Sequence, residues 1–114
     1  MKLKTDFVTN SSSTAFIITN TSDKDLDLVD FVKENPQLIE QFVKEYDYEN
    51  DSQYTQENMI MSAVKNNETF TESDRKYCVF GDEDGSLIGH VFDYILRDGG
   101  TSKNFMWRFE EYLR

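Results

Sequence analysis

The chain is poor in residues that cross-link or break a fold, with one cysteine, one proline and five glycines among 114 residues. A lone cysteine excludes an intrachain disulfide and a multi-cysteine zinc site, and it favours a reducing compartment. Long apolar runs are also missing, because the longest, about 15–18, is far too short to span a bilayer. No apolar stretch follows the first four residues in the way that a secretory signal requires. We therefore expect a cytoplasmic protein without membrane contact.

Basic residues are scarce as well: 12 Lys and Arg stand against 22 Asp and Glu, which gives a formal net charge of -10. A surface of this sign repels phosphate groups, so the composition argues against direct binding to nucleic acid or to anionic membranes. Aromatic residues make up 14% of the chain, too many for a disordered segment of this charge. The length fits a single domain over residues 1–114, of which 1–13 form a serine-rich N-terminal segment.

The first half of the chain predicts one strand and two helices. Residues 14–19 are β-branched and aromatic, which is typical of a buried strand. Ser22 and Asp25 have the spacing of a capping box, so we expect a helix to follow them and to end at Asn35. A proline then opens a second helix over 36–46, where apolar residues form one stripe.

The second half predicts two further helices and two strands. Thr55 is expected to cap a third helix that runs to about Lys65, and residues 77–80 form a second buried strand. Ser86 is expected to cap a fourth helix, which the glycine pair 99–100 ends.

The C-terminal segment fits two patterns. Phe105, Trp107 and Phe109 alternate as on a half-buried strand, whereas the aromatic spacing over 104–113 also fits one face of a helix. The aromatic density favours a strand over 104–110. The element order is then β-α-α-α-β-α-β. It predicts an α+β fold, a two-layer domain in which about four helices cover a small, mainly antiparallel sheet of about three strands.

The N-terminal segment carries a resemblance. Lys2 and Lys4 precede Phe7-Val8, then a threonine and the run Asn10–Ser13, and Phe16 follows near the start of the first strand. This opening resembles that of a group of small phage and bacterial proteins, which begin with basic residues and Phe-Val-x-Asn-Ser-Ser-Ser. The resemblance covers about 15 residues and implies a phage or mobile-element origin. It implies no activity, because no single function belongs to that group.

One set of side chains has the composition of a metal or acid–base site. His90, the only histidine, lies three residues before Asp93 on the expected fourth helix, so the two share a face. Asp82 and Asp84, with the serine two residues on, have the 1-3-5 spacing of a calcium loop. Leu87 then stands where such a loop needs glycine, which favours a solvated acidic turn instead.

The remaining nucleophiles lack a catalytic context. Cys78 lies in an expected buried strand, where a thiol is inert, and a pair with His90 is a minor alternative. The serines at 11–13 have no strand-turn-helix around them, and no glycine-rich phosphate loop is present. We therefore expect no enzyme activity, no catalytic residue and no cofactor.

The distribution of charge is more informative than any motif, because residues 21–60 hold 11 acidic and 3 basic residues, a local net charge of -8. Carboxylates steer association with basic surfaces, and tyrosine is favoured at binding hot spots. The residues that we expect to bind a partner are Asp23, Asp27, Asp30, Asp47, Tyr48, Glu49, Asp51 and Tyr54. A merely solubilising charged face is the alternative interpretation.

These observations favour a phage- or mobile-element-encoded inhibitor whose acidic face mimics nucleic acid and occupies the basic surface of a host protein. A nucleic-acid-handling defence enzyme of the bacterial cytoplasm, such as a CRISPR effector, is the partner class we expect. Two alternatives stay open. One is a structural or accessory phage protein that forms a homodimer through the strand edge at Trp107. The other is a small metal-dependent enzyme that uses His90 with Asp82, Asp84 and Asp93.

Overall fold

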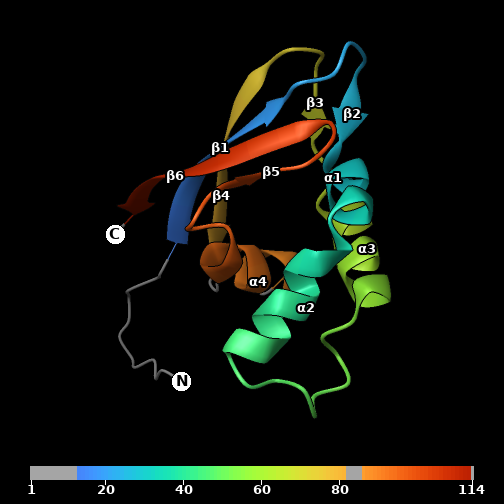
Figure 1. The fold of residues 1–114 in the computed structure, drawn as a ribbon, viewed down its shortest axis with the longest axis vertical. Coiled ribbons are helices and arrows are strands. Elements are labelled where there is room, and N and C mark those ends of the chain that lie inside the picture. The colour runs from blue at the N-terminus through green and yellow to red at the C-terminus, as the bar shows by residue number, and fades with distance from the viewer. Residues whose placement is uncertain (1–12, 82–85, 114) are drawn as a thin grey trace.

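Strands and helices of the chain are segregated into a sheet and a helical layer, as the sequence predicts (Figure 1). The computed structural model describes residues 13–81 and 86–113. Within them the elements are β1 (Ser13–Asn20), β2 (Leu26–Asp27), α1 (Leu28–Glu34), α2 (Pro36–Glu45), α3 (Gln56–Lys65), β3 (Thr69–Phe70), β4 (Arg75–Gly81), α4 (Leu87–Ile95), β5 (Gly100–Thr101) and β6 (Phe105–Leu113). The α+β class and the four helices are confirmed over this part of the chain.

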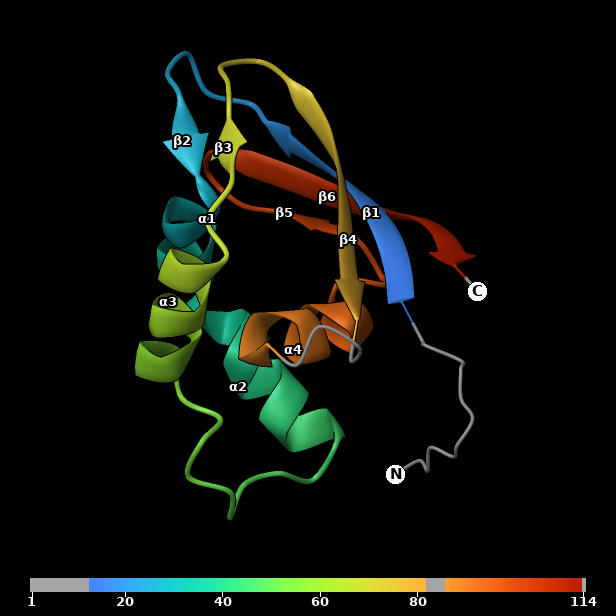
Figure 2. The same ribbon diagram turned by 180° about the vertical axis from the view of Figure 1, so that it is seen from behind.

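The main sheet has the strand order β4-β1-β6-β5 in the described residues, one strand more than expected, and all its pairs are antiparallel. β1 lies in the middle because its β-branched and aromatic residues suit a position with strands on both sides. Phe16 and Ile18 alternate along β1 and are fully buried against the helices. The helices lie on one face of this sheet, and the opposite face carries no helix among the described residues (Figures 1 and 2).

Three two-residue strands were not predicted. β2 and β3 pair with each other as a separate small sheet, and β5 adds to β6 at the sheet edge. The strand expected over 104–110 is confirmed and extends to Leu113, so the helical alternative for this segment is wrong.

Side-chain caps fix most of the helix starts. Thr55 accepts a hydrogen bond from the Asn58 amide, and Ser86 accepts one from the Gly89 amide, both as expected. The expected capping box at Ser22 and Asp25 is wrong, because the box is formed by Asp27 and Asp30 instead.

The reason is the β2–β3 pair, which keeps the backbone extended as far as Asp27. Ser22 instead donates to Asn20 Oδ1 and to the Lys24 carbonyl, and so stabilises the turn after β1.

The fourth helix ends earlier than expected. Its last residue is Ile95, and the chain turns at Gly99, whose φ of 73° is accessible to glycine at little cost. Gly100 then pairs with Trp107, and a Cβ at this glycine would lie 2.6 Å from the indole ring. The glycine pair therefore makes room for β5 beside Trp107 rather than marking the end of α4.

Glu34, the last residue of α1, ties the helical layer to the β5–β6 turn. Its carboxylate accepts hydrogen bonds from the Ser102 hydroxyl and from both the main-chain and the side-chain amide of Asn104. Burial by itself would raise the pKa of Glu34, but these hydrogen bonds outweigh burial and hold the pKa below its usual value.

Within residues 13–81 and 86–113, none of the helices has the length and apolar character that crossing a membrane requires.

Candidate functional site

A cluster of aromatic rings closes the end of the molecule where α2, α4 and the α2–α3 loop meet. Its centre is the buried Phe42 on α2, which stacks on Tyr48 at 5.5 Å with ring planes 13° apart. Tyr54 stacks in turn on Tyr48 at 4.5 Å, and His90 of α4 meets Phe42 edge-on at 5.5 Å. We call Phe42, Tyr46, Tyr48, Tyr54, His90 and Tyr94 the aromatic cluster. These contacts fix the α2–α3 loop to the helical layer at two points.

The loop leaves α2 through a Schellman motif. The Tyr48 amide donates to the Val43 carbonyl at 2.9 Å, and Asp47 between them has a φ of 66°, in the left-handed region. The stack of Tyr48 on Phe42 supplies the apolar contact that usually accompanies this motif. The backbone at Asp47 is therefore set by the fold, and its side chain stands in solvent.

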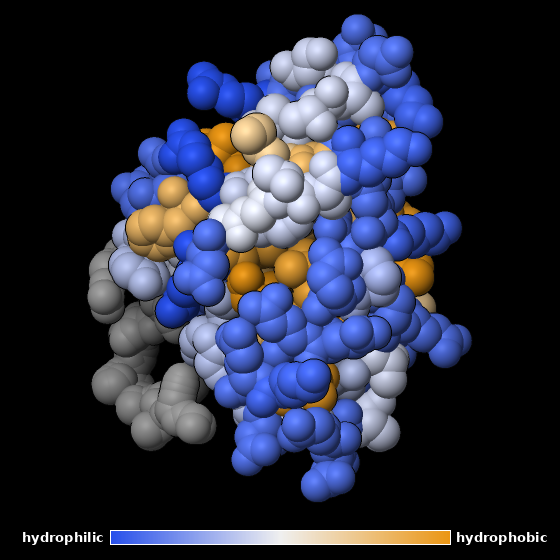
Figure 3. Space-filling view, viewed as in Figure 1, coloured by the Kyte–Doolittle hydropathy of each residue, from blue (hydrophilic) through white to orange (hydrophobic). Residues whose placement is uncertain are grey.

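Three carboxylates project from this anchored loop. Asp47, Glu49 and Asp51 are all exposed and alternate with the inward ring of Tyr48; we call these three the acidic loop. Asp51 also accepts hydrogen bonds from the amide and the side chain of Gln53, which shape the turn. On the face of the molecule that Figure 3 shows, the end formed by α2 and this loop is largely hydrophilic. A fixed loop presents its charges without the entropy loss that ordering a flexible loop on binding would bring.

The pKa of the Tyr46 phenol, next to the acidic loop, is affected by nearby carboxylates. Burial raises the pKa of Tyr46, and Arg97 lowers it. The carboxylates of Glu45 and Asp98 raise it again, so that the net pKa lies above the ordinary value.

Replacing Asp47 by glycine is expected to stabilise the protein by roughly 0.5–1 kcal/mol, because glycine takes a positive φ without steric cost. Asp47→Asn, which removes the same charge but tolerates this φ almost as aspartate does, is expected to change the free energy of unfolding by less than about 0.5 kcal/mol. Urea unfolding of the two variants measures both values. A destabilised Asp47→Gly variant would show that this residue carries no backbone strain.

The structure does not bring all the predicted partner-binding residues together. Asp23 lies in the turn after β1, at the end of the molecule opposite the acidic loop along its longest dimension of 43 Å (Figure 1). Asp27 and Asp30 lie at the start of α1, where each carboxylate accepts a hydrogen bond from the other residue's amide. Asn67 also donates a hydrogen bond to Asp27. Burial by itself would raise the pKa of the Asp27 carboxyl, but the hydrogen bonds that it accepts hold the pKa below its ordinary value.

Tyr48 and Tyr54 also differ from the expectation of an exposed aromatic surface. Both are half-buried and point into the aromatic cluster, so they support the loop rather than covering its outside. The position of Tyr48 was the available signal, because an apolar residue three positions after the last helical residue often packs back on the final turn of that helix.

The candidate metal residues are engaged elsewhere. The His90 ring lies among the aromatic cluster, and Asp93 is fully buried with its Oδ1 accepting from the Thr14 hydroxyl and, at 3.2 Å, from Arg97. Asp82 and Asp84 lie outside the described residues. In residues 13–81 and 86–113, no three His, Cys, Asp or Glu side chains group closely enough to hold a metal ion.

Sequence analysis missed the contact of Asp93 with Thr14 and Arg97. The i,i+4 spacing of Asp93 and Arg97 could have indicated the ion pair between them. The Thr14 contact joins residues 79 positions apart, which no local pattern reveals.

The thiol and the groove of the bare sheet face offer no catalytic arrangement. Cys78 is 2% exposed, and burial, with a smaller effect of Glu68, raises its pKa to about 12, against the lowering effect of Lys76. Such a thiol is not a nucleophile at neutral pH. On the sheet face without helices, a shallow groove of about 390 Å³ has no histidine, cysteine or carboxylate in its lining, which consists of Ile17, Thr19, Arg75, Gly100, Thr101, Met106, Trp107 and Arg108.

No family model, curated protein or solved structure matches this chain.

Proposed function

We propose that this chain is a non-enzymatic binding protein that presents the acidic loop to a basic, nucleic-acid-binding surface of a host protein. The observation that carries the proposal is the acidic loop itself: Asp47, Glu49 and Asp51 are exposed on a backbone that the aromatic cluster fixes in place. Carboxylates held in this way resemble the phosphates of a nucleic acid in the sign of their charge, and they attract the same basic surfaces. The resemblance of the N-terminal segment supports a phage or mobile-element origin alone. From that origin we infer that the host protein is a bacterial nucleic-acid-handling defence enzyme, such as a CRISPR effector.

We confine the proposed binding surface to one end of the molecule. Asp27 and Asp30 satisfy backbone amides at the start of α1, so their carboxylates have a structural reason to be present. Asp47 and Glu49 have no hydrogen-bond or ion-pair partner among the described residues. Asp47 and Glu49 are therefore groups that a basic partner would meet without first breaking an internal contact, whereas the Asp51 carboxylate is shared with Gln53.

Affinity capture from a bacterial lysate tests this proposal with a charge-neutral triple variant, Asp47→Asn, Glu49→Gln and Asp51→Asn. We expect a basic protein to be captured by the natural chain and to bind the variant about tenfold less tightly, because exposed ion pairs contribute about 0.5 kcal/mol each. Raising the salt concentration is expected to weaken capture, since exposed charges are screened. The captured protein should release nucleic acid when the natural chain is added.

The matched control removes the same number of charges at the opposite end, through Asp23→Asn, Asp25→Asn and Glu72→Gln. Asparagine at position 25 can still accept the hydrogen bond that Asp25 takes from the Glu72 amide. This control should bind as the natural chain does. Loss of capture in the control, or capture that is unchanged in the acidic-loop variant, would contradict the proposal.

A further inference from the structure

The strand β4 ends the main sheet with an open edge. It pairs with β1 on one side, and no strand lies on its other side in the described residues. Its register with β1 is unbroken over all seven residues, and it contains no proline. Seen from behind, β4 runs nearest to the viewer with no other ribbon in front of it (Figure 2). A long, regular and uncovered edge is a template for a further strand.

The opposite side of the sheet is a poorer template. There β5 covers only Met106 and Trp107 of β6, and Trp107 is paired on both sides and 5% exposed, so it does not lie at a free edge as expected. Further along, β6 is interrupted at Glu110, because Phe109 pairs with Phe16 whereas Glu111 pairs with the next residue, Ala15. Such bulges twist an edge and disfavour pairing. The edge suited to another strand is therefore that of β4.

We propose that β4 pairs antiparallel with β4 of a second copy of this chain, about a two-fold axis, so that two sheets join into one. A two-fold axis perpendicular to the sheet keeps each side chain on its own face. Residues of the outer face therefore oppose only residues of the outer face. The longest overlap of two seven-residue strands has Cys78 at the axis. In this register Tyr77 opposes Val79 of the second copy, and the symmetry repeats the pair.

The side chains of β4 suit this register. Tyr77 and Val79 are 49% and 43% exposed on the outer face, and an aromatic residue opposite a β-branched one is a favourable cross-strand pair. Charge agrees as well, because Arg75 opposes Gly81 of the second copy. No like charges are therefore directly opposed within Arg75–Gly81.

Light scattering on the purified chain tests this pairing without any partner protein, so its outcome is independent of the proposed function. At about 100 µM we expect twice the chain mass of 13.4 kDa. The double variant Tyr77→Lys, Val79→Lys places four ammonium groups at the centre of the ladder and is expected to be a monomer, since like charges opposite each other repel. The matched control is Met106→Lys, 44% exposed on the same sheet face but in an inner strand. It should remain a dimer.

Circular dichroism checks that each variant is folded. We expect both to fold, because Tyr77, Val79 and Met106 are exposed and lysine at these positions stays in solvent. A natural chain that stays monomeric at this concentration overturns the proposal. A dimer that survives the double lysine variant, or that dissociates only with Met106→Lys, would place the contact elsewhere and overturns it too.

Discussion

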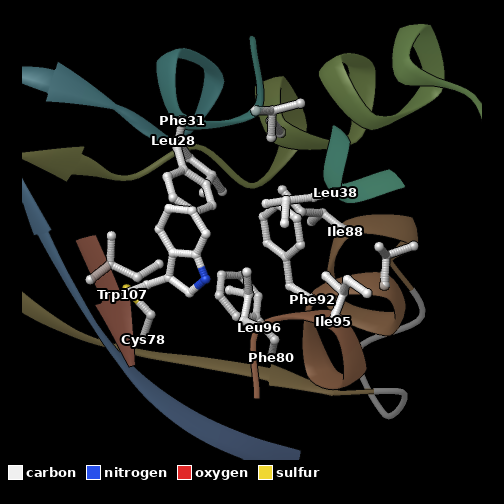
Figure 4. Packing of buried hydrophobic residues seen from close by; sticks show 14 of the residues in the cluster. Leu28, Phe31, Leu38, Cys78, Phe80, Ile88, Phe92, Ile95, Leu96 and Trp107 are labelled. Carbon is white, nitrogen blue, oxygen red and sulfur yellow. The ribbon is translucent and has the colours of Figure 1, made fainter. Parts of the chain in front are cut away.

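Replacing Phe31 by alanine is expected to remove about 4 kcal/mol from the free energy of unfolding, a large fraction of the roughly 5–15 kcal/mol that stabilises an ordinary domain. Phe31 is fully buried and lies edge-on to three rings, Phe92 at 5.5 Å, Phe105 at 5.1 Å and Trp107 at 5.2 Å. These rings come from α4 and β6, so Phe31 joins α1 to both the helical layer and the sheet (Figure 4).

The size of the effect follows from where the cavity would open. Alanine at position 31 leaves three large rings with a vacant side, and none of them can move in without leaving its own strand or helix. Each edge-to-face contact also contributes about 0.5–1.5 kcal/mol beyond the burial of its surface. The loss therefore exceeds what the transfer of one phenyl ring from water would give.

Trp107 provides the measurement, because it is the only tryptophan in the chain and it contacts Phe31. Urea unfolding followed by its fluorescence gives the free energy of both proteins. The control is Met61→Ala on α3, where the side chain is 57% exposed and the change should stay within about 0.5 kcal/mol. A loss below about 1.5 kcal/mol for Phe31→Ala would show that the core closes around the gap.

Elements that depend on local chemistry could be predicted from the sequence. The caps at Thr55 and Ser86 use a side chain and an amide three residues on, so the signal lies within one turn. The stripe of α2 is equally local, because Leu38, Ile39 and Phe42 recur at helical spacing and all three are buried.

Features that depend on distant pairing could not be predicted. β2 has only two residues, and its existence depends on Leu26 meeting Phe70, 44 positions away. That pair also decides where α1 starts, which is why the capping box lies at Asp27 and Asp30 although Ser22 and Asp25 have the same spacing. When two places in a sequence fit the same capping motif, only the tertiary structure decides at which of them the helix begins.

The candidate site divides in the same way. That the α2–α3 loop would be acidic and exposed is visible in the sequence, and Asp47, Glu49 and Asp51 are exposed. The sequence does not reveal that Asp23 lies at the opposite end of the molecule. Between Asp23 and the acidic loop the chain runs along the long axis through α1 and α2 (Figure 1). A charge count over residues 21–60 joins two groups of carboxylates that the fold separates.

Replacing Asp93 by alanine is expected to cost about 3 kcal/mol, the second-largest effect. Asp93 is fully buried on α4, where it accepts from the hydroxyl of Thr14, itself 1% exposed, at the start of β1. Arg97 contacts the same carboxylate at 3.2 Å, and its guanidinium lies over the rings of Tyr94 and Tyr112 at 4.7 Å and 5.1 Å. Alanine at position 93 leaves a buried hydroxyl without its acceptor and a cation without its carboxylate.

We place the cost at the lower end of the range for broken buried ion pairs because the Arg97 side chain is 31% exposed, and water replaces part of what it loses. Asp93→Asn keeps an oxygen for the Thr14 hydroxyl and should cost about half as much. Urea unfolding measures both variants.

A double-mutant cycle with Thr14→Val decides whether the hydrogen bond between β1 and α4 is responsible. Valine has the shape of threonine without the hydroxyl, so each single change breaks the same bond and the double change should cost at least 1 kcal/mol less than their sum. Asp93→Leu with Thr14→Val should recover further stability, because two apolar side chains then fill the space that a buried carboxylate and hydroxyl occupied. Additive costs would mean that the Thr14 contact contributes nothing to holding β1 on α4.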